Sequence, residues 1–218
     1  MRKLLLLSLT VATITACHFS TSMGDEVKGS GKRTTEKRQL GDFTAVQVDG
    51  AYEVKISVGS RGDVQIDADD NILPLIKTTV KDGRLIISSE QKFSVGSSPI
   101  VSLSAKNIHD VSGNGASKFD VSGVQGTAFN VTAVGATKFH CTGQTNKLTV
   151  DISGAGSVEA RELQAKDVVV KSNGAASAVV FASETLEADI NGVGSVDYYG
   201  NPKTVNKKIN GMGTLNAK

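Results

Sequence analysis

A short phrase ending in glycine recurs six times between residues 111 and 213, and this repetition restricts the possible folds more than any other feature. Each copy contains an aliphatic residue, three mostly small or polar residues, and then glycine. The copies begin 18 to 21 residues apart and comprise Val111–Gly115, Val131–Gly135, Ile152–Gly156, Val170–Gly174, Ile190–Gly194 and Ile209–Gly213. Self-similarity with a period of about 20 to 50 residues is typical of stacked-repeat architectures.

The residues around each glycine alternate between apolar and polar, which predicts short strands with one buried face. Helices are disfavoured because an interior glycine costs about 1 kcal/mol. We therefore predict an all-β fold: a single-stranded parallel β-helix, or solenoid, with about 20 residues per coil. Equivalent inward residues should stack, with Phe119 over Phe139 and Val121 over Cys141. An antiparallel meander ranks second, because hairpins do not require a constant period. The fourth repeat, after Gly174, does not show which of its residues point inward.

The first 16 residues are typical of a lipoprotein signal peptide, with basic Met1-Arg-Lys3 followed by an apolar run too short to cross a bilayer. Ile14-Thr-Ala-Cys17 resembles the lipobox of bacterial lipoproteins, in which the cysteine is lipidated and becomes the new N-terminus. This predicts a lipid at Cys17 that holds the protein on a membrane. His18 follows instead of aspartate, which favours the outer membrane of the cell envelope. A plain secretory signal is the alternative.

The remaining chain divides into two expected parts. Residues 17–39 are polar and are predicted to be the lipidated N-terminus and a flexible tether, and residues 40–218 the β-helical head domain. In the head, Asp82-Gly83 between apolar runs predicts a hairpin. The tether's basic residues are partly cancelled by its acidic ones.

Charge and cysteine content exclude several classes of function. Loss of Arg2 and Lys3 with the signal peptide leaves 22 basic and 22 acidic residues. A chain without a basic excess is a poor nucleic-acid binder, because such proteins need a basic face for the phosphates. Cys141 is the only other cysteine, and its inward position predicts a buried structural thiol.

The sequence has no nucleophile elbow, phosphate loop or histidine or cysteine pair at metal-ligand spacing, so it predicts no catalytic residue, metal ligand or cofactor. Two weaker candidates remain. Equivalent positions after the glycines should build an outward polar column of Asp120, His140, Glu159 and Asp197, and paired carboxylates could act on a polysaccharide. Outward strand positions must be polar anyway, so this enzymatic interpretation is secondary. Tyr199 is the candidate aromatic platform for a ligand.

Several phrases together resemble one bacterial family. Asp49-Gly-Ala-Tyr-Glu-Val54, Asn71-Ile-Leu-Pro-Leu-Ile76, Val80-Lys-Asp-Gly-Arg-Leu85 and the glycine phrases are similar to the putative auto-transporter adhesin, head GIN domain family, over roughly residues 43–215. The resemblance implies an exported β-helical domain, often lipid-anchored. It transfers no functional residue, because the biochemical role of the family is not established.

The expected function is that of a non-enzymatic, lipid-anchored envelope or surface protein, an adhesion or interaction scaffold with an envelope glycan or protein as ligand. The alternatives are a polysaccharide-acting β-helix enzyme and a structural or assembly protein. The last coil, ending at Thr214–Lys218, should leave a strand edge open. We expect this edge to self-associate or to bind a protein partner, with nearby lysines limiting unwanted pairing.

Overall fold

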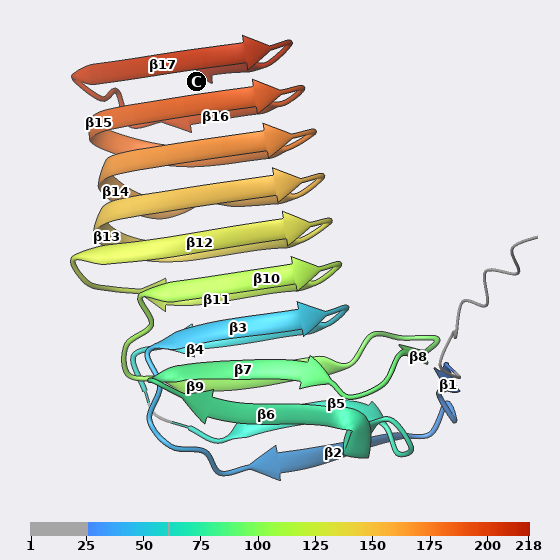
Figure 1. The fold of residues 1–218 in the computed structure, drawn as a ribbon. Coiled ribbons are helices and arrows are strands. Elements are labelled where there is room, and N and C mark those ends of the chain that lie inside the picture. Colours follow the sequence, from blue (N-terminus) through green and yellow to red (C-terminus); the bar gives the residue numbers. More distant parts are fainter. Residues whose placement is uncertain (1–25, 61) are drawn as a thin grey trace, which may run out of the picture.

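The computed structural model describes residues 26–60 and 62–218, which form a β-solenoid of about 5 turns with roughly 20 residues per turn (Figure 1). Successive coils pair in parallel, as Val111 with Val131 and Phe119 with Phe139 show. The predicted parallel β-helix is therefore confirmed, and the antiparallel meander is wrong for the repeats. Within the described residues, no helix is both long and apolar enough to span a membrane.

Each coil contributes one strand to each of two long faces. The first face follows the order β6-β7-β3-β10-β12-β13-β14-β15-β17. Its strands are β6 (Ile76–Lys81), β7 (Arg84–Ser89), β3 (Ala45–Gly50), β10 (Asp110–Gly115), β12 (Ala128–Gly135), β17 (Thr204–Gly211) and the C-terminal halves of β13 (Lys138–Gly154), β14 (Ser157–Gly174) and β15 (Ser177–Gly192).

The second face follows the order β2-β5-β9-β4-β11-β13-β14-β15-β16-β18. Its strands are β2 (Arg33–Arg38), β5 (Val64–Asp69), β9 (Ile100–Ala105), β4 (Glu53–Val58), β11 (Lys118–Val124), the N-terminal halves of β13 to β15, β16 (Ser195–Tyr199) and β18 (Thr214–Ala217). A 3₁₀ turn, η1 (Leu73–Leu75), precedes β6, and β1 (Val27–Lys28) pairs with β8 (Phe93–Ser94) beside the N-terminal end.

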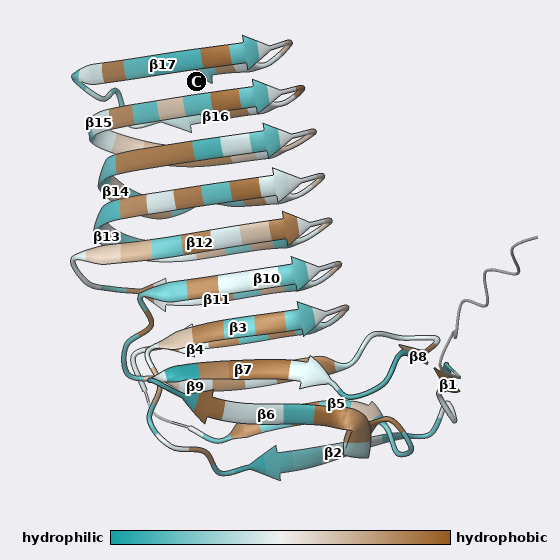
Figure 2. Cartoon of the chain, viewed as in Figure 1, coloured by the Kyte–Doolittle hydropathy of each residue, from teal (hydrophilic) through white to brown (hydrophobic). Residues whose placement is uncertain are grey.

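Apolar and polar residues alternate along the strands, as Figure 2 shows, and the apolar set fills the interior between the two faces. The Phe119 and Phe139 rings stack with centroids 4.3 Å apart and an angle of 12°. Val121 pairs with Cys141, and both are fully buried. Burial raises the pKa of the Cys141 thiol far above its usual value, so the thiol stays protonated and structural. In the fourth repeat the inward residues are Ala178 and Val180, in register with Val158 and Ala160.

A column of glycines marks the corner that leads from the first face to the second. Its members pair coil by coil and all have positive φ: Gly50, Gly115, Gly135, Gly154, Gly174, Gly192 and Gly211. In three copies of the repeated phrase, the final glycine is therefore not the corner glycine. These copies end at Gly156, Gly194 and Gly213, whereas the corner lies two residues earlier. In each Gly-x-Gly of these copies, only the first glycine has the left-handed conformation.

The predicted flexible tether is wrong for its C-terminal part, because β2 pairs antiparallel with β5 along residues 33–38. Arg33 Nε donates a hydrogen bond to Asp67 Oδ1 at 2.7 Å, and Arg38 Nη1 donates to the Ile76 carbonyl at 2.7 Å. The backbone pairing of β2 covers an edge of the second face that β5 would otherwise leave open. Ordered structure thus begins well before residue 40. Cys17 and the predicted signal peptide lie outside the described residues.

The pair of Arg33 and Asp67 should make stability depend on pH. Hydrogen bonds from Arg33 and then Thr35 lower the pKa of Asp67. A carboxyl with a depressed folded-state pKa stabilises the fold above its unfolded pKa, near 3.9, and loses this effect as the pH falls through the folded value. Asp67→Asn should therefore lower the free energy of unfolding at pH 7 by up to about 1 kcal/mol.

Urea unfolding at several pH values tests this pair. The difference between the parent protein and Asp67→Asn should shrink as the pH falls below about 4. The control is Asp82→Asn, in the β6–β7 turn, where asparagine tolerates the left-handed backbone. A difference that is constant with pH would contradict the assignment.

Candidate interaction surfaces

The predicted polar column lies on the second face, where the strand register places its four residues in one row. Asp120 pairs with His140 and His140 with Glu159, and the row continues through Val179 to Asp197. We call this set, with Lys55 and Asn216 at its ends, the charged row. Val179 interrupts it between Glu159 and Asp197.

Two pairs of neighbours in the charged row are in contact. His140 Nδ1 lies 3.2 Å from Asp120 Oδ1, and Asn216 Nδ2 donates a hydrogen bond of 2.8 Å to Asp197 Oδ1. Lys218 Nζ lies 3.4 Å from Asp197 Oδ2. Adjacent positions stay about 4.8 Å apart along a flat sheet instead of converging on one point. The described residues contain no group of three or more His, Cys, Asp or Glu side chains that could hold a metal ion.

Tyr199, the predicted platform, carries a cation on its ring. The guanidinium carbon of Arg161 lies 4.3 Å from the ring centroid, although β15 separates the two strands that carry them. Such a contact contributes about 0.5 to 1 kcal/mol at an exposed site. One ring face is thus occupied by Arg161, and only the edge and remaining surface are available to a ligand. Phe181 pairs with Tyr199 in register.

An open hollow lies at the corner that leads from the second face back to the first. This corner groove has a volume of about 610 Å³ and is lined by Gly123, Val124, Gln125, Gly126, Gly143, Gln144, Thr145, Asn146 and Gln164. Gln144 pairs with Gln164 in register. Val124, which precedes Gln125, pairs with Gly143, which precedes Gln144. This groove is not among the sites predicted from the sequence. The signal was a glutamine recurring about once per coil, at positions 125, 144 and 164.

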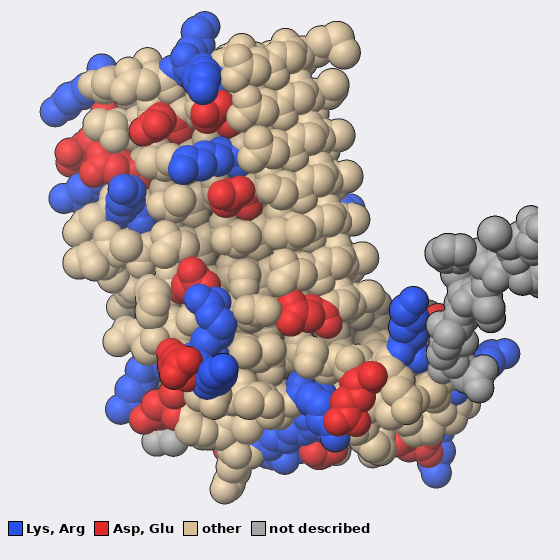
Figure 3. Space-filling model, in the orientation of Figure 1, with Lys and Arg blue, Asp and Glu red and all other residues tan. Residues whose placement is uncertain are grey.

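The first face carries a second ordered row, in which charges alternate. Asp151, Lys171, Asp189 and Lys208 pair successively across β13, β14, β15 and β17. Lys208 Nζ lies 3.7 Å from Asp189 Oδ2, and Asn210 donates a hydrogen bond of 2.7 Å to Asn191. Figure 3 shows this alternation over the upper strands, whereas the glycine corner at the right is uncharged. Positive and negative charges therefore balance along this row of the first face.

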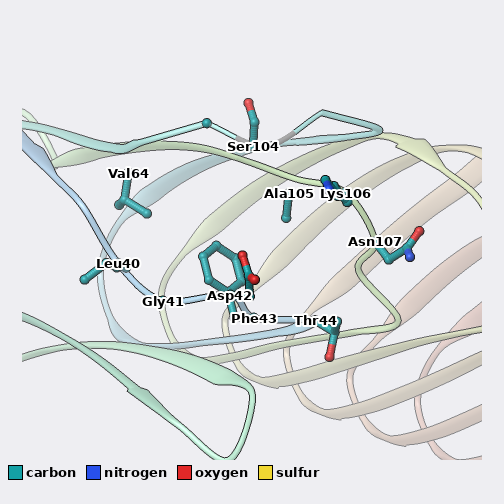
Figure 4. A pocket seen from close by; sticks show the side chains of 11 residues that line it. Leu40, Gly41, Asp42, Phe43, Thr44, Val64, Ser104, Ala105, Lys106 and Asn107 are labelled. Carbon is teal, nitrogen blue, oxygen red and sulfur yellow. The ribbon is translucent and has the colours of Figure 1, made fainter.

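Two further cavities lie near the N-terminal end. One, of about 240 Å³, is enclosed by the segments 40–44, 62–64 and 104–107 and combines apolar Phe43 and Val64 with polar Ser104 and Lys106 (Figure 4). The other, of about 450 Å³, lies between the glycine corner and the β8 loop. Tyr52 lines it and has a buried hydroxyl with no partner among the described residues. Burial and then the charge of Asp49 raise the pKa of Tyr52 to about 12, so the hydroxyl remains a donor.

Solved structures share this architecture. A crystal structure of a putative adhesin from Bacteroides fragilis matches with a TM-score of 0.69 and 21% identity, covering 88% of this chain and 100% of that one. A putative adhesin from Parabacteroides merdae gives a TM-score of 0.58 and 24% identity over 89% and 99% of the two chains. A putative lipid binding protein from Parabacteroides distasonis gives 0.53 and 16% over 89% and 100%.

These similarities establish a common fold. Because all three identities are below 25%, they establish nothing beyond the fold. No curated protein matches the chain. The sequence profile of DUF2807, described as putative auto-transporter adhesin, head GIN domain, matches residues 42–202. This segment covers the solenoid from before β3 to the loop after β16, including the glycine column except Gly211 and most of the charged row. The chain belongs to the DUF2807 family of putative auto-transporter adhesin head GIN domains.

Proposed function

We propose that the protein is a non-catalytic interaction scaffold, anchored by a lipid at Cys17 to the outer membrane and used for adhesion at the cell envelope. The observation that carries the proposal is the solenoid itself: two long faces with outward polar side chains in rows at strand spacing. Such a body offers an extended, regular surface, as repeat proteins that bind partners do. The adhesin names of the similar solved structures agree with this use.

The position of the N-terminal end supports the anchor. Val27 and Lys28 lie beside β8 at one end of the solenoid, far from β17 (Figure 1). A lipid at Cys17, ten residues earlier, would attach the protein near that end. Both long faces, the corner groove and the last coil would then stay accessible to partners.

The enzymatic alternative has weaker support. The carboxylates of the charged row lie along a flat face, and Asp120 and Asp197 each contact a neighbour in the row. They do not face each other across a space for a glycosidic bond, as glycoside hydrolysis requires. The nine residues that line the corner groove carry no charge. The cavity beside Tyr52 does gather ionisable side chains, including Glu26, Glu90 and Lys92, but its tyrosine stays protonated.

The anchor is tested with Cys17→Ser in a Gram-negative host. The parent protein should incorporate an alkyne-tagged fatty acid and sediment with outer membranes, because acyl chains contribute about 0.8 kcal/mol per buried CH₂. The variant should incorporate no label and be released as soluble protein. Cys141→Ser is the matched control and should be labelled like the parent. Equal labelling of Cys17→Ser would refute the anchor.

The scaffold role is tested with purified protein on a glycan array and on envelope fractions, together with an assay for new reducing ends on the same polysaccharides. Saturable binding without cleavage is the expected result. Release of reducing ends would favour the enzyme instead. Absence of any saturable binding to glycans or to envelope material would contradict the scaffold.

A further inference from the structure

The corner groove combines three glutamine side chains that have no partner among the residues that the structure describes. Gln125, Gln144 and Gln164 are exposed, and none of them makes a hydrogen bond or ion pair within the described part of the chain. This differs from the other polar rows, where Asn210 binds Asn191 and Asn216 binds Asp197. The three amides are therefore solvated, and a ligand that replaces water can use both their donors and their acceptors.

The lining of the groove selects the chemistry of a ligand. None of its nine residues is charged, so neither an anion nor a cation would find a counter-charge there. Its apolar component is small, because Val124 is fully buried. Each amide offers one acceptor and two donors, which complement adjacent hydroxyls that also donate and accept. This composition fits a neutral ligand rich in hydroxyl groups.

The surroundings of the groove agree with this selection. On the left of Figure 3, the surface around the start of β12 is uncharged, with charged side chains above and below it. The glutamine column continues in register from Gln164 to Phe181 and then to Tyr199. Phe181 and Tyr199 are half-buried, and Arg161 covers one face of the Tyr199 ring, so the two aromatic residues border the groove with limited exposed surface. Aromatic surface next to amides is suited to the apolar faces and the hydroxyls of sugar rings.

The spacing of the glutamine side chains from coil to coil matches the repeat of an extended sugar polymer. Successive side chains lie about 4.8 Å apart, the distance between paired strands. One sugar ring in an extended chain has a comparable length, so each coil would meet one unit. A peptide fits less well, because strand addition needs a free edge and the strands of the middle coils are paired on both sides.

We propose that the corner groove is a binding site for a neutral oligosaccharide that lies across the coils. The amides of Gln125, Gln144 and Gln164 bind its hydroxyls, and Phe181 and Tyr199 extend the site toward the C-terminal end. This inference rests on the proposed role as a non-catalytic scaffold and specifies the ligand class at one site. It also assigns Tyr199 to the margin of a groove, in place of an isolated platform.

The test uses the purified full-length mature protein with maltohexaose, cellohexaose, xylohexaose and mannohexaose, and with an oligogalacturonate as the charged comparison. Nitrogen-15 NMR follows the side-chain amides during each titration. At least one neutral hexasaccharide should shift the signals of Gln125, Gln144 and Gln164 and leave those of Gln65, an exposed glutamine on β5, unchanged. The oligogalacturonate should bind more weakly.

Substitutions provide the second arm. Gln144→Ala removes one amide and should weaken binding about tenfold, the equivalent of about 1.4 kcal/mol. Gln144→Glu keeps the shape but removes the donors and adds a charge, and should weaken binding at least as much. Gln65→Ala is the matched control and should bind like the parent. Thermal unfolding verifies that each variant is folded.

The outcomes separate this inference from the scaffold role. If the parent binds a neutral glycan and Gln144→Ala binds it equally, the groove is not the site, whereas the scaffold role stands. If only charged glycans or an envelope protein bind, the neutral ligand class is wrong. If none of the probes and no envelope material binds, the scaffold role fails as well.

Discussion

Gly154→Ala is expected to lower the free energy of unfolding by roughly 3 to 5 kcal/mol, enough to threaten the fold of a protein of ordinary stability. Gly154 has φ of 117°, a conformation that alanine rarely adopts. A Cβ atom there would lie 2.7 Å from the Gly135 carbonyl oxygen, which also accepts a hydrogen bond of 2.8 Å from the Ala155 amide. The coil above would have to move away from the coil below, and the stacked arrangement would lose its spacing.

Gly126→Ala separates backbone strain from this steric contact. Gly126 has φ of 135°, but a Cβ atom would meet nothing within 4 Å. Its cost should be limited to the strain of the backbone, about 1 to 3 kcal/mol. Urea unfolding followed by far-ultraviolet circular dichroism measures both variants. Equal losses would show that coil stacking does not depend on the close approach at the glycine corner.

The repeat made the architecture of this chain predictable from sequence. Alternation around a 20-residue period placed Phe119 and Phe139 in one interior column, and the rings do stack. The pairing of Val121 with Cys141 followed from the same alignment. Stacked coils place equivalent residues in contact, so a local pattern specifies contacts between coils.

The exact register was less predictable, because Gly-x-Gly offers two glycines for one corner. Gly154 and Gly156 both suit a tight turn, but only Gly154 pairs with Gly135. The N-terminal strand was missed for another reason. Residues 33–38 are polar on both sides and are ordered by pairing with β5, whose partner residues lie 26 (Arg38 to Val64) to 36 (Arg33 to Asp69) positions later in the sequence. Periodicity within the segment contains no information about such a partner.

Candidate sites were predictable only where they follow the repeat. The positions of Asp120, His140, Glu159 and Asp197 in one row follow from strand register. The contact of Arg161 with Tyr199 does not follow from strand register. A bulge in β14 displaces the chain near Arg161, and the Arg161 side chain crosses β15 to reach Tyr199. The corner groove likewise depends on how irregular corners stack. Its free amides could be recognised only once the contacts of each side chain were known.

The last coil of the solenoid carries a lysine at an inward position. Lys207 pairs with Ala188, which is buried, and lies between Val205 and Ile209 on the same side of β17. Those neighbours are 37% and 36% exposed, because no further described strand covers β17. An inward-pointing charge on an edge strand is a recognised protection against pairing with another chain, since stacking a coil on it would bury the ammonium group.

Lys207→Val should therefore convert this edge into a site of self-association. The substitution creates a continuous apolar row with Val205 and Ile209, and a second copy could then cover it without burying a charge. Light scattering after size-exclusion chromatography should show concentration-dependent oligomers for the variant at concentrations where the parent protein is monomeric. Lys208→Val, one residue further and on the outward side, changes the net charge equally and should remain monomeric. Equal association of the two variants would attribute the effect to net charge, and an associating parent would show that Lys207 does not protect the edge.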